Sequence, residues 1–231
     1  MAPREIAVGC GDDLALASDD AVQAARQLGL PVALKLESPD LPHKTEADVI
    51  RLGLASDDAV RAACAESAQG EVVEAVNFNA PSQVVIAGHK AAVERAAAAA
   101  KAKGAKRAVM LPVSAPFHAS LLKPAADRLA QALAAITFNV PQIPVVNNVD
   151  VAVVSDPQQI KHALARQACS PVRWVEVIQH MARSGITHVG ECGPGKVLAG
   201  MTKRIENSLQ GFAVADAASL AQSLQLVKEA A

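Results

Sequence analysis

The segment EVVEAVNFNAPSQVVIAGH, from Glu71 to His89, contains two short runs rich in β-branched residues on either side of the turn-forming residues NAPS. Runs bounded in this way predict two strands joined as a β-hairpin. A helix is expected on each side of the hairpin. Ser56 with two aspartates behind it predicts an N-capped helix over AVRAACAES, and AAVERAAAAAKAK predicts a second helix that ends at Gly104.

Two more aliphatic runs extend this unit. VIRLGL (Val49–Leu54) precedes the first helix, and RAVMLPV (Arg107–Val113) follows the second. From Asp48 to Val113 the predicted order is therefore βαββαβ. This is the split βαβ, or ferredoxin-like, arrangement.

The rest of the chain alternates between helical and strand-like patterns, which predicts an α/β fold with a parallel, helix-covered sheet. Before the hairpin unit we expect a helix near 19–28 and a strand at 31–37. After it we expect helices at 123–135, 157–167 and 175–184, a short strand at Ile143–Val146, and a buried strand in ITHVGE (186–191). A glycine turn and a helix come next, and FAVA (212–215) leads into a last helix.

Composition excludes several classes of function. Hydrophobic residues make up 51% of the chain, enough for a sizeable core. A net charge of −1, with four Phe, one Trp and no Tyr, gives neither the charge nor the stacking surface for nucleic acid. The four widely spaced cysteines suit a reducing compartment and no metal site. Acidic residues near the start and the lack of a long apolar run predict no signal peptide and no membrane span, hence a cytoplasmic protein.

Four longer stretches identify a family. They occur in the order VNFNAPSQVVIAG (76–88), LPVSAPFHASLLKPAADRL (111–129), PQIPVVNNVDV (141–151) and ECGPGKVLAGMTKRI (191–205), and RQACSPVRWVE (166–176) lies between the last two. From about Leu54 to the C-terminus the chain resembles the C-terminal part of the malonyl-CoA:acyl carrier protein transacylases. The resemblance covers roughly three quarters of the chain.

The resemblance implies roles for five residues. His118 matches the family's base, which activates a serine that attacks the malonyl thioester and later passes the acyl group to the carrier's phosphopantetheine thiol. Gln167 matches the residue whose main-chain carbonyl orients that histidine. Asn77 and Asn79 match polar residues of the substrate cleft, and Phe117 resembles the bulky residue that favours malonyl over branched acyl groups. Malonyl-CoA and acyl carrier protein are the implied partners, and no cofactor or metal is implied.

Parts of the family's catalytic apparatus are absent from these 231 residues. The sequence contains no G-x-S-x-G nucleophile elbow. The early glutamine-containing glycine loop of the oxyanion hole and the arginine that binds the malonyl carboxylate are also missing. Ser114 and Ser120 flank His118 but lie in no elbow, so both are expected to be turn or helix-start hydroxyls. The chain alone is therefore expected to be inactive or severely impaired.

The N-terminal segment resembles a different family. LGLPVALKLESPDLPHKTEADVIRLGL (28–54) is similar to part of the ATP-grasp domain of ADP-forming acyl-CoA synthetases. The fragment is too short for a two-lobed ATP cleft, so nucleotide binding by Lys35, His43 or Lys44 is not expected. A fusion near Leu54, where both families place a strand before a capped helix, explains both resemblances. A natural fusion, an engineered one and an assembly artefact leave the same sequence.

A second nucleotide motif is incomplete. GECGPGK (Gly190–Lys196) fits G-x-x-x-x-G-K between a strand and a helix, but Val197 stands where a Mg²⁺-binding hydroxyl is needed. Pro194 also removes one backbone donor from the phosphate cradle. A tight structural turn is the expected reading.

The expected organisation has three parts: an ATP-grasp-like fragment (1–47), a ferredoxin-like subdomain (48–113) and the C-terminal part of an acyltransferase large subdomain with an incomplete hydrolase-like sheet (114–231). Two functions stay open. The chain is either a malonyltransferase component that needs a serine-bearing half, or a non-catalytic fragment that binds a partner or self-associates through uncovered faces.

Overall fold

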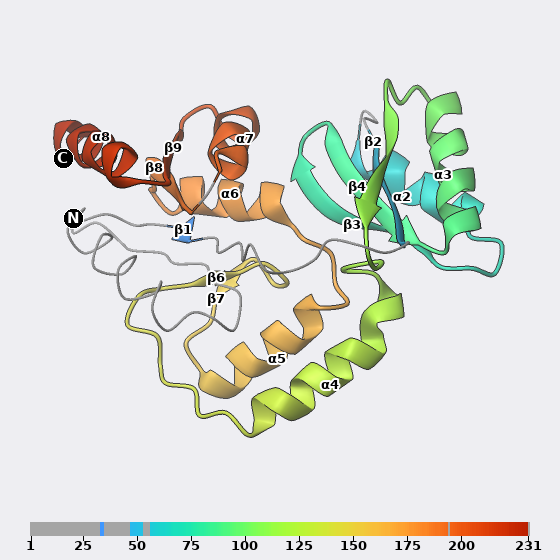
Figure 1. Cartoon of the computed structure of the whole chain (residues 1–231), viewed down its shortest axis with the longest axis horizontal. Helices are drawn as coiled ribbons and strands as arrows, with labels where there is room; N and C mark the ends of the chain where they lie inside the picture. Colours follow the sequence, from blue (N-terminus) through green and yellow to red (C-terminus); the bar gives the residue numbers. More distant parts are fainter. Residues whose placement is uncertain (1–32, 35–46, 53–55, 194, 231) are drawn as a thin grey trace.

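The computed structural model describes residues 33–34, 47–52, 56–193 and 195–230 (Figure 1). The helix expected near 19–28 and the loop residues His43 and Lys44 lie outside these ranges, as does Lys35. Of the strand expected at 31–37, the structure describes Ala33–Leu34 as a strand. The described residues form a mixed α/β arrangement with a four-stranded antiparallel sheet, a three-stranded parallel sheet and a two-stranded antiparallel sheet.

The antiparallel sheet contains strands β2 (Ala47–Leu52), β3 (Val73–Ala80), β4 (Gln83–Gly88) and β5 (Ala108–Val113) in the order β3-β4-β2-β5. Every neighbouring pair in it is antiparallel. The hairpin predicted around NAPS is confirmed as β3 and β4, with Ala80 paired to Gln83. The strand expected at 49–54 is β2, which lies between β4 and β5.

Helices α2 (Asp57–Ser67) and α3 (Lys90–Ala102) cover one face of this sheet (Figure 1). The predicted cap is confirmed, because the Ser56 side chain accepts the backbone N–H of Ala59 at 3.2 Å. The alanines of α3 allow close packing: Ala92, Ala96 and Ala100 are fully buried. They share a core with β-branched and aromatic residues of α2, β3 and β4.

Cys64 of α2 lies in this core at 3% exposure. Burial raises the pKa of its thiol from 9.0 to about 12, and Glu74 adds to this shift while Arg61 opposes it. The pKa of the thiol is higher in the folded state than in the unfolded state. The neutral Cys64 thiol therefore contributes fully to the stability of the fold below pH 9, and this contribution is lost as the pH rises toward 12.

We therefore expect the wild-type chain to lose about 1.4 kcal/mol more stability than Cys64→Ala between pH 8 and pH 10, since one unit above the free thiol's pKa corresponds to that energy. Urea unfolding of both proteins at each pH measures the difference. Equal losses in the two proteins would contradict this account of the Cys64 environment.

The parallel sheet has the order β1-β8-β9, where β1 is Ala33–Leu34, β8 is His188–Cys192 and β9 is Gln210–Val214. Both pairings are parallel. The parallel pair β8–β9 agrees with the sheet predicted for this half, whereas β1 comes from the segment predicted as an ATP-grasp-like fragment. Helix α7 (Val197–Ile205) connects β8 to β9, and α6 (Trp174–Arg183) and α8 (Ala217–Ala230) lie beside the sheet (Figure 1). The core here is formed by residues such as Val177, Ile178, Met181 and Val189.

Between the two sheets in the sequence, η1 (Ser120–Leu122) leads into α4 (Lys123–Ala134), which packs against α5 (Pro157–Gln167) (Figure 1). The prediction of a strand at Ile143–Val146 is wrong in its bounds and in the sheet to which the strand belongs. The structure has a two-residue strand β6 (Val146–Asn147) that pairs antiparallel with β7 (Ala152–Val153). Pro144 explains the difference, because it has no N–H to donate to a neighbouring strand.

Among the described helices, none is long and apolar enough to cross a membrane.

Candidate active site

His118 lies in the turn between β5 and η1, and its backbone has a left-handed φ of 66°. The residues after it anchor the turn to β3. Ala119 is fully buried against Val76, and Ser120 donates its backbone N–H and its hydroxyl to the two carboxylate oxygens of Glu74 at 2.7 and 2.8 Å. A left-handed φ at a non-glycine residue is a strained conformation, which persists only where the surroundings impose it.

The His118 side chain is half-buried and contacts the C-terminal end of α5. Its Nδ1 lies 2.9 Å from the main-chain oxygen of Gln167, the last residue of that helix. Carbonyls in the last turn of a helix have no partner within the helix, and besides His118 this oxygen accepts only a long bond from the Ser170 N–H, at 3.4 Å, among the described residues. Because a carbonyl only accepts, a neutral imidazole in this contact carries its proton on Nδ1 and leaves Nε2 as the acceptor. The imidazole therefore has the tautomer of a general base acting through Nε2.

The Gln167 side chain belongs to a second set of hydrogen bonds. Its Oε1 accepts from Nδ2 of Asn148 at 2.7 Å, and its Nε2 donates to the Ser170 carbonyl at 3.2 Å. Asn148 also donates to the Pro171 carbonyl at 3.2 Å and accepts the Arg173 backbone N–H at 2.7 Å. Sequence reasoning assigned no role to Asn148 or to Glu74, although both stand inside or beside the quoted motifs.

Strand β3 joins the segment that follows Gln167. Val172 donates its N–H to the Val76 carbonyl and accepts the N–H of Phe78, both at 2.8 Å. Asn77 and Asn79 are half-buried on β3, one on each side of the buried Phe78 in sequence. Neither asparagine side chain hydrogen-bonds to His118 in the described part of the chain. Phe117, next to His118, is 49% exposed.

The two serines near His118 show no nucleophile geometry. The Ser120 hydroxyl donates to Glu74 and so is directed to β3 rather than to the imidazole. Ser114 is exposed, and within the residues described it makes no hydrogen bond to His118. No group of three or more His, Cys, Asp or Glu in these same residues is arranged to hold a metal ion.

The glycine turn after β8 is filled by the protein's own carboxylate. Glu191 is 7% exposed, and its Oε2 accepts the backbone N–H of Ala199 at 2.8 Å in the first turn of α7. A helix N-terminus attracts anions, and here the carboxylate of Glu191 accepts one of its N–H groups. Glu191 therefore supplies at this helix end the carboxylate that takes the position of a bound phosphate.

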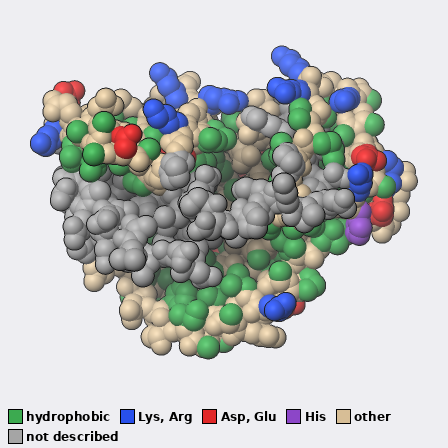
Figure 2. Space-filling model, in the orientation of Figure 1, with side chains coloured by type: hydrophobic (Ala, Val, Ile, Leu, Met, Phe, Trp, Pro, Cys, Tyr) green, Lys and Arg blue, Asp and Glu red, His purple; other side chains and the backbone are tan. Residues whose placement is uncertain are grey.

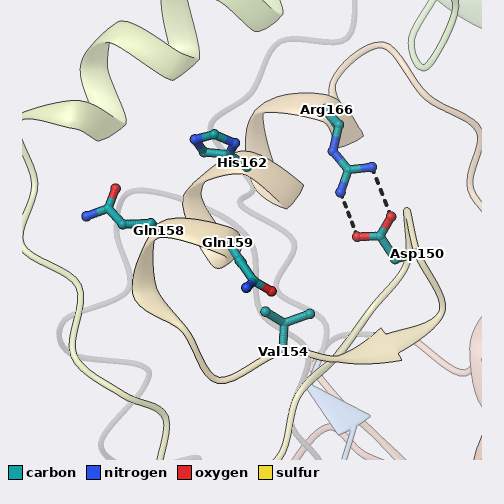
Figure 3. Close-up of a pocket in the computed structure, with 6 residues that line it drawn as sticks. All are labelled: Asp150, Val154, Gln158, Gln159, His162 and Arg166. Carbon is teal, nitrogen blue, oxygen red and sulfur yellow. Dashed lines mark hydrogen bonds and ion pairs between the residues drawn. The ribbon is translucent and has the colours of Figure 1, made fainter.

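A pocket of about 290 Å³ lies elsewhere, where α5 faces the loop after β6 (Figure 3). Arg166 closes one side of it with two hydrogen bonds to the Asp150 carboxylate, at 2.9 and 2.6 Å. These bonds from Arg166 hold the pKa of Asp150 below its ordinary value. The remaining lining residues are Val154, Gln158, Gln159 and His162, so His118 is not part of this pocket.

Comparison with known proteins places the chain. It is 50% identical over 207 residues to the malonyl CoA-acyl carrier protein transacylase of Escherichia coli K12, across 90% of this chain and 65% of that protein. A crystal structure of an acyl carrier protein S-malonyltransferase from Vibrio cholerae is 45% identical with a TM-score of 0.80, over 89% of this chain and 78% of that one. A malonyl-transacylase solved in complex with its type II PKS acyl-carrier protein is also 45% identical, with a TM-score of 0.77, over 93% of this chain and 66% of that one.

The fold and these likenesses define an α/β protein of the acyltransferase class. The chain belongs to the malonyl-CoA:acyl carrier protein transacylase family. It spans 65% of the length of the Escherichia coli relative.

A family model described as an ATP-grasp domain matches residues 9–70, in agreement with the second resemblance of the N-terminal segment. The two likenesses overlap. The alignment with the Escherichia coli protein leaves only 24 of the 231 residues outside it, so it reaches N-terminally past Leu54 into the ATP-grasp match.

The left-handed backbone at His118 predicts a difference in stability between two substitutions at this position. Glycine and alanine variants both lose the bond to Gln167, but only alanine keeps a Cβ at a φ of 66°. We expect His118→Gly to be more stable than His118→Ala by about 1 kcal/mol, because an L residue in this region costs about that much. Paired urea denaturation curves measure the difference, and an alanine variant as stable as the glycine variant would show that the turn is unstrained.

Proposed function

We propose that these 231 residues are the base-bearing part of a malonyl-CoA:acyl carrier protein S-malonyltransferase and are inactive, or severely impaired, without a serine from outside them. The observation that carries this proposal is the 2.9 Å contact between Nδ1 of His118 and the Gln167 carbonyl, which leaves Nε2 free to take a proton. The lack of G-x-S-x-G supports the second half of it.

The chemistry requires two transfers through Nε2 of His118. As a serine oxygen attacks the malonyl thioester carbonyl, Nε2 accepts the hydroxyl proton, the carbon–sulfur bond breaks, and CoA leaves as a thiol with that proton. In the second half, the carrier's phosphopantetheine thiol gives its proton to Nε2 and attacks the malonyl ester. The serine then leaves as a hydroxyl with the proton returned.

The substrates and partner are proposed from the family. The names of the similar proteins specify malonyl groups and acyl carrier protein, and one relative was solved with its carrier bound. We assign Asn77 and Asn79 to the substrate cleft because both are half-buried on β3 beside the Gln167 loop. Phe117, exposed next to His118, is assigned to selection of malonyl over branched acyl groups.

The domain organisation is part of the same proposal: 1–47 as an ATP-grasp-like fragment, 48–113 as the ferredoxin-like subdomain and 114–231 as the C-terminal part of an incomplete acyltransferase sheet. The strand order β3-β4-β2-β5 with two helices on one face supports the middle assignment. The unpaired Cys64, Cys169 and Cys192 support a reducing, cytoplasmic setting.

A second candidate is a non-catalytic fragment that binds a partner or a second copy of itself. Large apolar side chains support it: Ile136 is 51% and Val140 62% exposed just after α4, and Leu129 and Leu164 are more than one third exposed on α4 and α5. Figure 2 shows hydrophobic side chains gathered at the end of the molecule formed by α4. Apolar surface of this kind favours association.

Transfer of radiolabelled malonyl from malonyl-CoA to holo acyl carrier protein tests the proposal. The purified chain alone is expected to give background label. Addition of the N-terminal, serine-bearing half of a relative is expected to give transfer that neither half supports alone. Transfer by the chain alone would contradict the inactivity claim, and a pair that associates without transferring would favour the non-catalytic candidate.

A further inference from the structure

The tautomer of His118 depends on two groups of one residue. The Gln167 main-chain oxygen, at 2.9 Å from Nδ1, can only accept, whereas the Gln167 side-chain Nε2, at 3.5 Å from the same atom, can only donate. The first requires a proton on Nδ1 and the second requires none. Only the first arrangement leaves Nε2 of His118 able to act as a base.

Asn148 is placed to keep the first arrangement. Its Oδ1 accepts the Arg173 backbone N–H, a donor that cannot reverse its role, so the Asn148 amide has a fixed orientation. Both Nδ2 hydrogens are then directed at acceptors, the Gln167 Oε1 at 2.7 Å and the Pro171 carbonyl at 3.2 Å. One side chain therefore ties together the beginning and the end of the 167–173 segment.

The same bonds hold the Gln167 amide away from the imidazole. With Oε1 bonded to Asn148 and Nε2 donating to the Ser170 carbonyl at 3.2 Å, the amide cannot close the 3.5 Å gap to Nδ1. Loss of Asn148 releases the Gln167 side-chain amide, which can then donate to Nδ1 of His118.

We propose that Asn148 is a positioning residue that sets the tautomer of His118 through Gln167. The role of Asn148 explains how His118 is kept ready to act as a base, and in this respect it rests on the proposed function. The tautomer itself can be measured without any transfer reaction. Failure of the transferase proposal and failure of the Asn148 proposal are therefore separate results.

The test is the side-chain ¹⁵N spectrum of the 231-residue protein at a pH where His118 is neutral, with His118→Ala used to assign its signals. We expect the wild-type chain to show His118 with the proton on Nδ1. Asn148→Ala is expected to lower the ratio of the Nδ1–H to the Nε2–H form about five-fold, the effect of one lost neutral hydrogen bond. Gln167→Ala removes the competing amide and keeps the main-chain carbonyl, so it is expected to leave His118 with its proton on Nδ1.

Asp150→Asn is the matched control. It weakens the neighbouring ion pair to Arg166, one residue before Gln167, and is expected to leave the His118 tautomer unchanged. An unchanged tautomer in Asn148→Ala would overturn the proposal, as would a wild-type His118 with its proton on Nε2. If Asn148→Ala does not fold, Asn148→Asp decides the question, because it keeps an acceptor for the Arg173 N–H and loses both donors. An unchanged tautomer there overturns the proposal equally.

Discussion

His118→Ala is expected to lower malonyl transfer about a thousand-fold when the chain is combined with a serine-bearing half. General-base catalysis contributes about 10²- to 10⁴-fold, and serine without a base is a poor nucleophile near neutral pH. The alanine variant also leaves the Gln167 carbonyl without its imidazole partner. Initial rates of label transfer to holo acyl carrier protein measure the effect.

Ser114→Ala is the control for this experiment, because Ser114 is exposed and not bonded to His118 in the described structure. It is expected to transfer at the wild-type rate. Activity in His118→Ala within about ten-fold of wild type would place the base elsewhere, since a general base is worth at least about a hundred-fold. An inactive Ser114→Ala would instead identify Ser114 as the nucleophile.

Gly88→Ala is expected to destabilise the antiparallel sheet by about 3 kcal/mol or more, at the upper end of overpacking effects. A Cβ at Gly88 would lie 2.0 Å from the Val72 carbonyl oxygen and 2.7 Å from the Val73 Cα. This backbone cannot move aside easily. His89 donates its N–H to the Val72 carbonyl at 2.8 Å, and its Nδ1 accepts the Val72 N–H at 3.0 Å.

Gly200→Ala in α7 is the matched substitution, because a Cβ there has no neighbour within 4 Å. It is expected to stabilise the chain by about 0.5–1 kcal/mol, the helix propensity difference. Urea unfolding of both variants against wild type gives the two values. A Gly88→Ala protein within about 1 kcal/mol of wild type would mean that β3 and β4 do not approach as closely as described.

Local patterns were sufficient to predict most elements of the antiparallel unit. Ser56 caps α2, the NAPS turn joins β3 to β4, and β-branched runs form the strands, because each depends on residues close in sequence. The strand expected at Ile143–Val146 was wrong for a local reason as well. Pro144 cannot donate to a ladder, which leaves only Val146–Asn147 to pair.

The site could not be predicted from patterns alone. The role of His118 came from a family resemblance, and its partner Gln167 lies 49 positions away. The contacts of Asn148 with Gln167 and of Glu74 with Ser120 span 19 and 46 positions. No periodicity encodes such pairs, since they depend on how α5, β3 and the β6–β7 hairpin are packed.

The phosphate-loop motif shows that a sequence pattern can also suggest a site that the structure does not support. GECGPGK has the right spacing and lies between a strand and a helix, so sequence could only weigh Val197 and Pro194 against it. The structure adds a physical reason against a phosphate site: the buried carboxylate of Glu191, in β8, accepts the Ala199 N–H in the first turn of α7. Its charge occupies the place that a phosphate would need.

The most direct test of the central claim, a base retained without its nucleophile, is the intact mass of the purified chain after incubation with malonyl-CoA. An unmodified mass is expected, because no serine in the described part of the chain hydrogen-bonds to His118 and the sequence contains no G-x-S-x-G elbow. A malonyl adduct on a serine of this chain, formed in wild type and absent in His118→Ala, would contradict it.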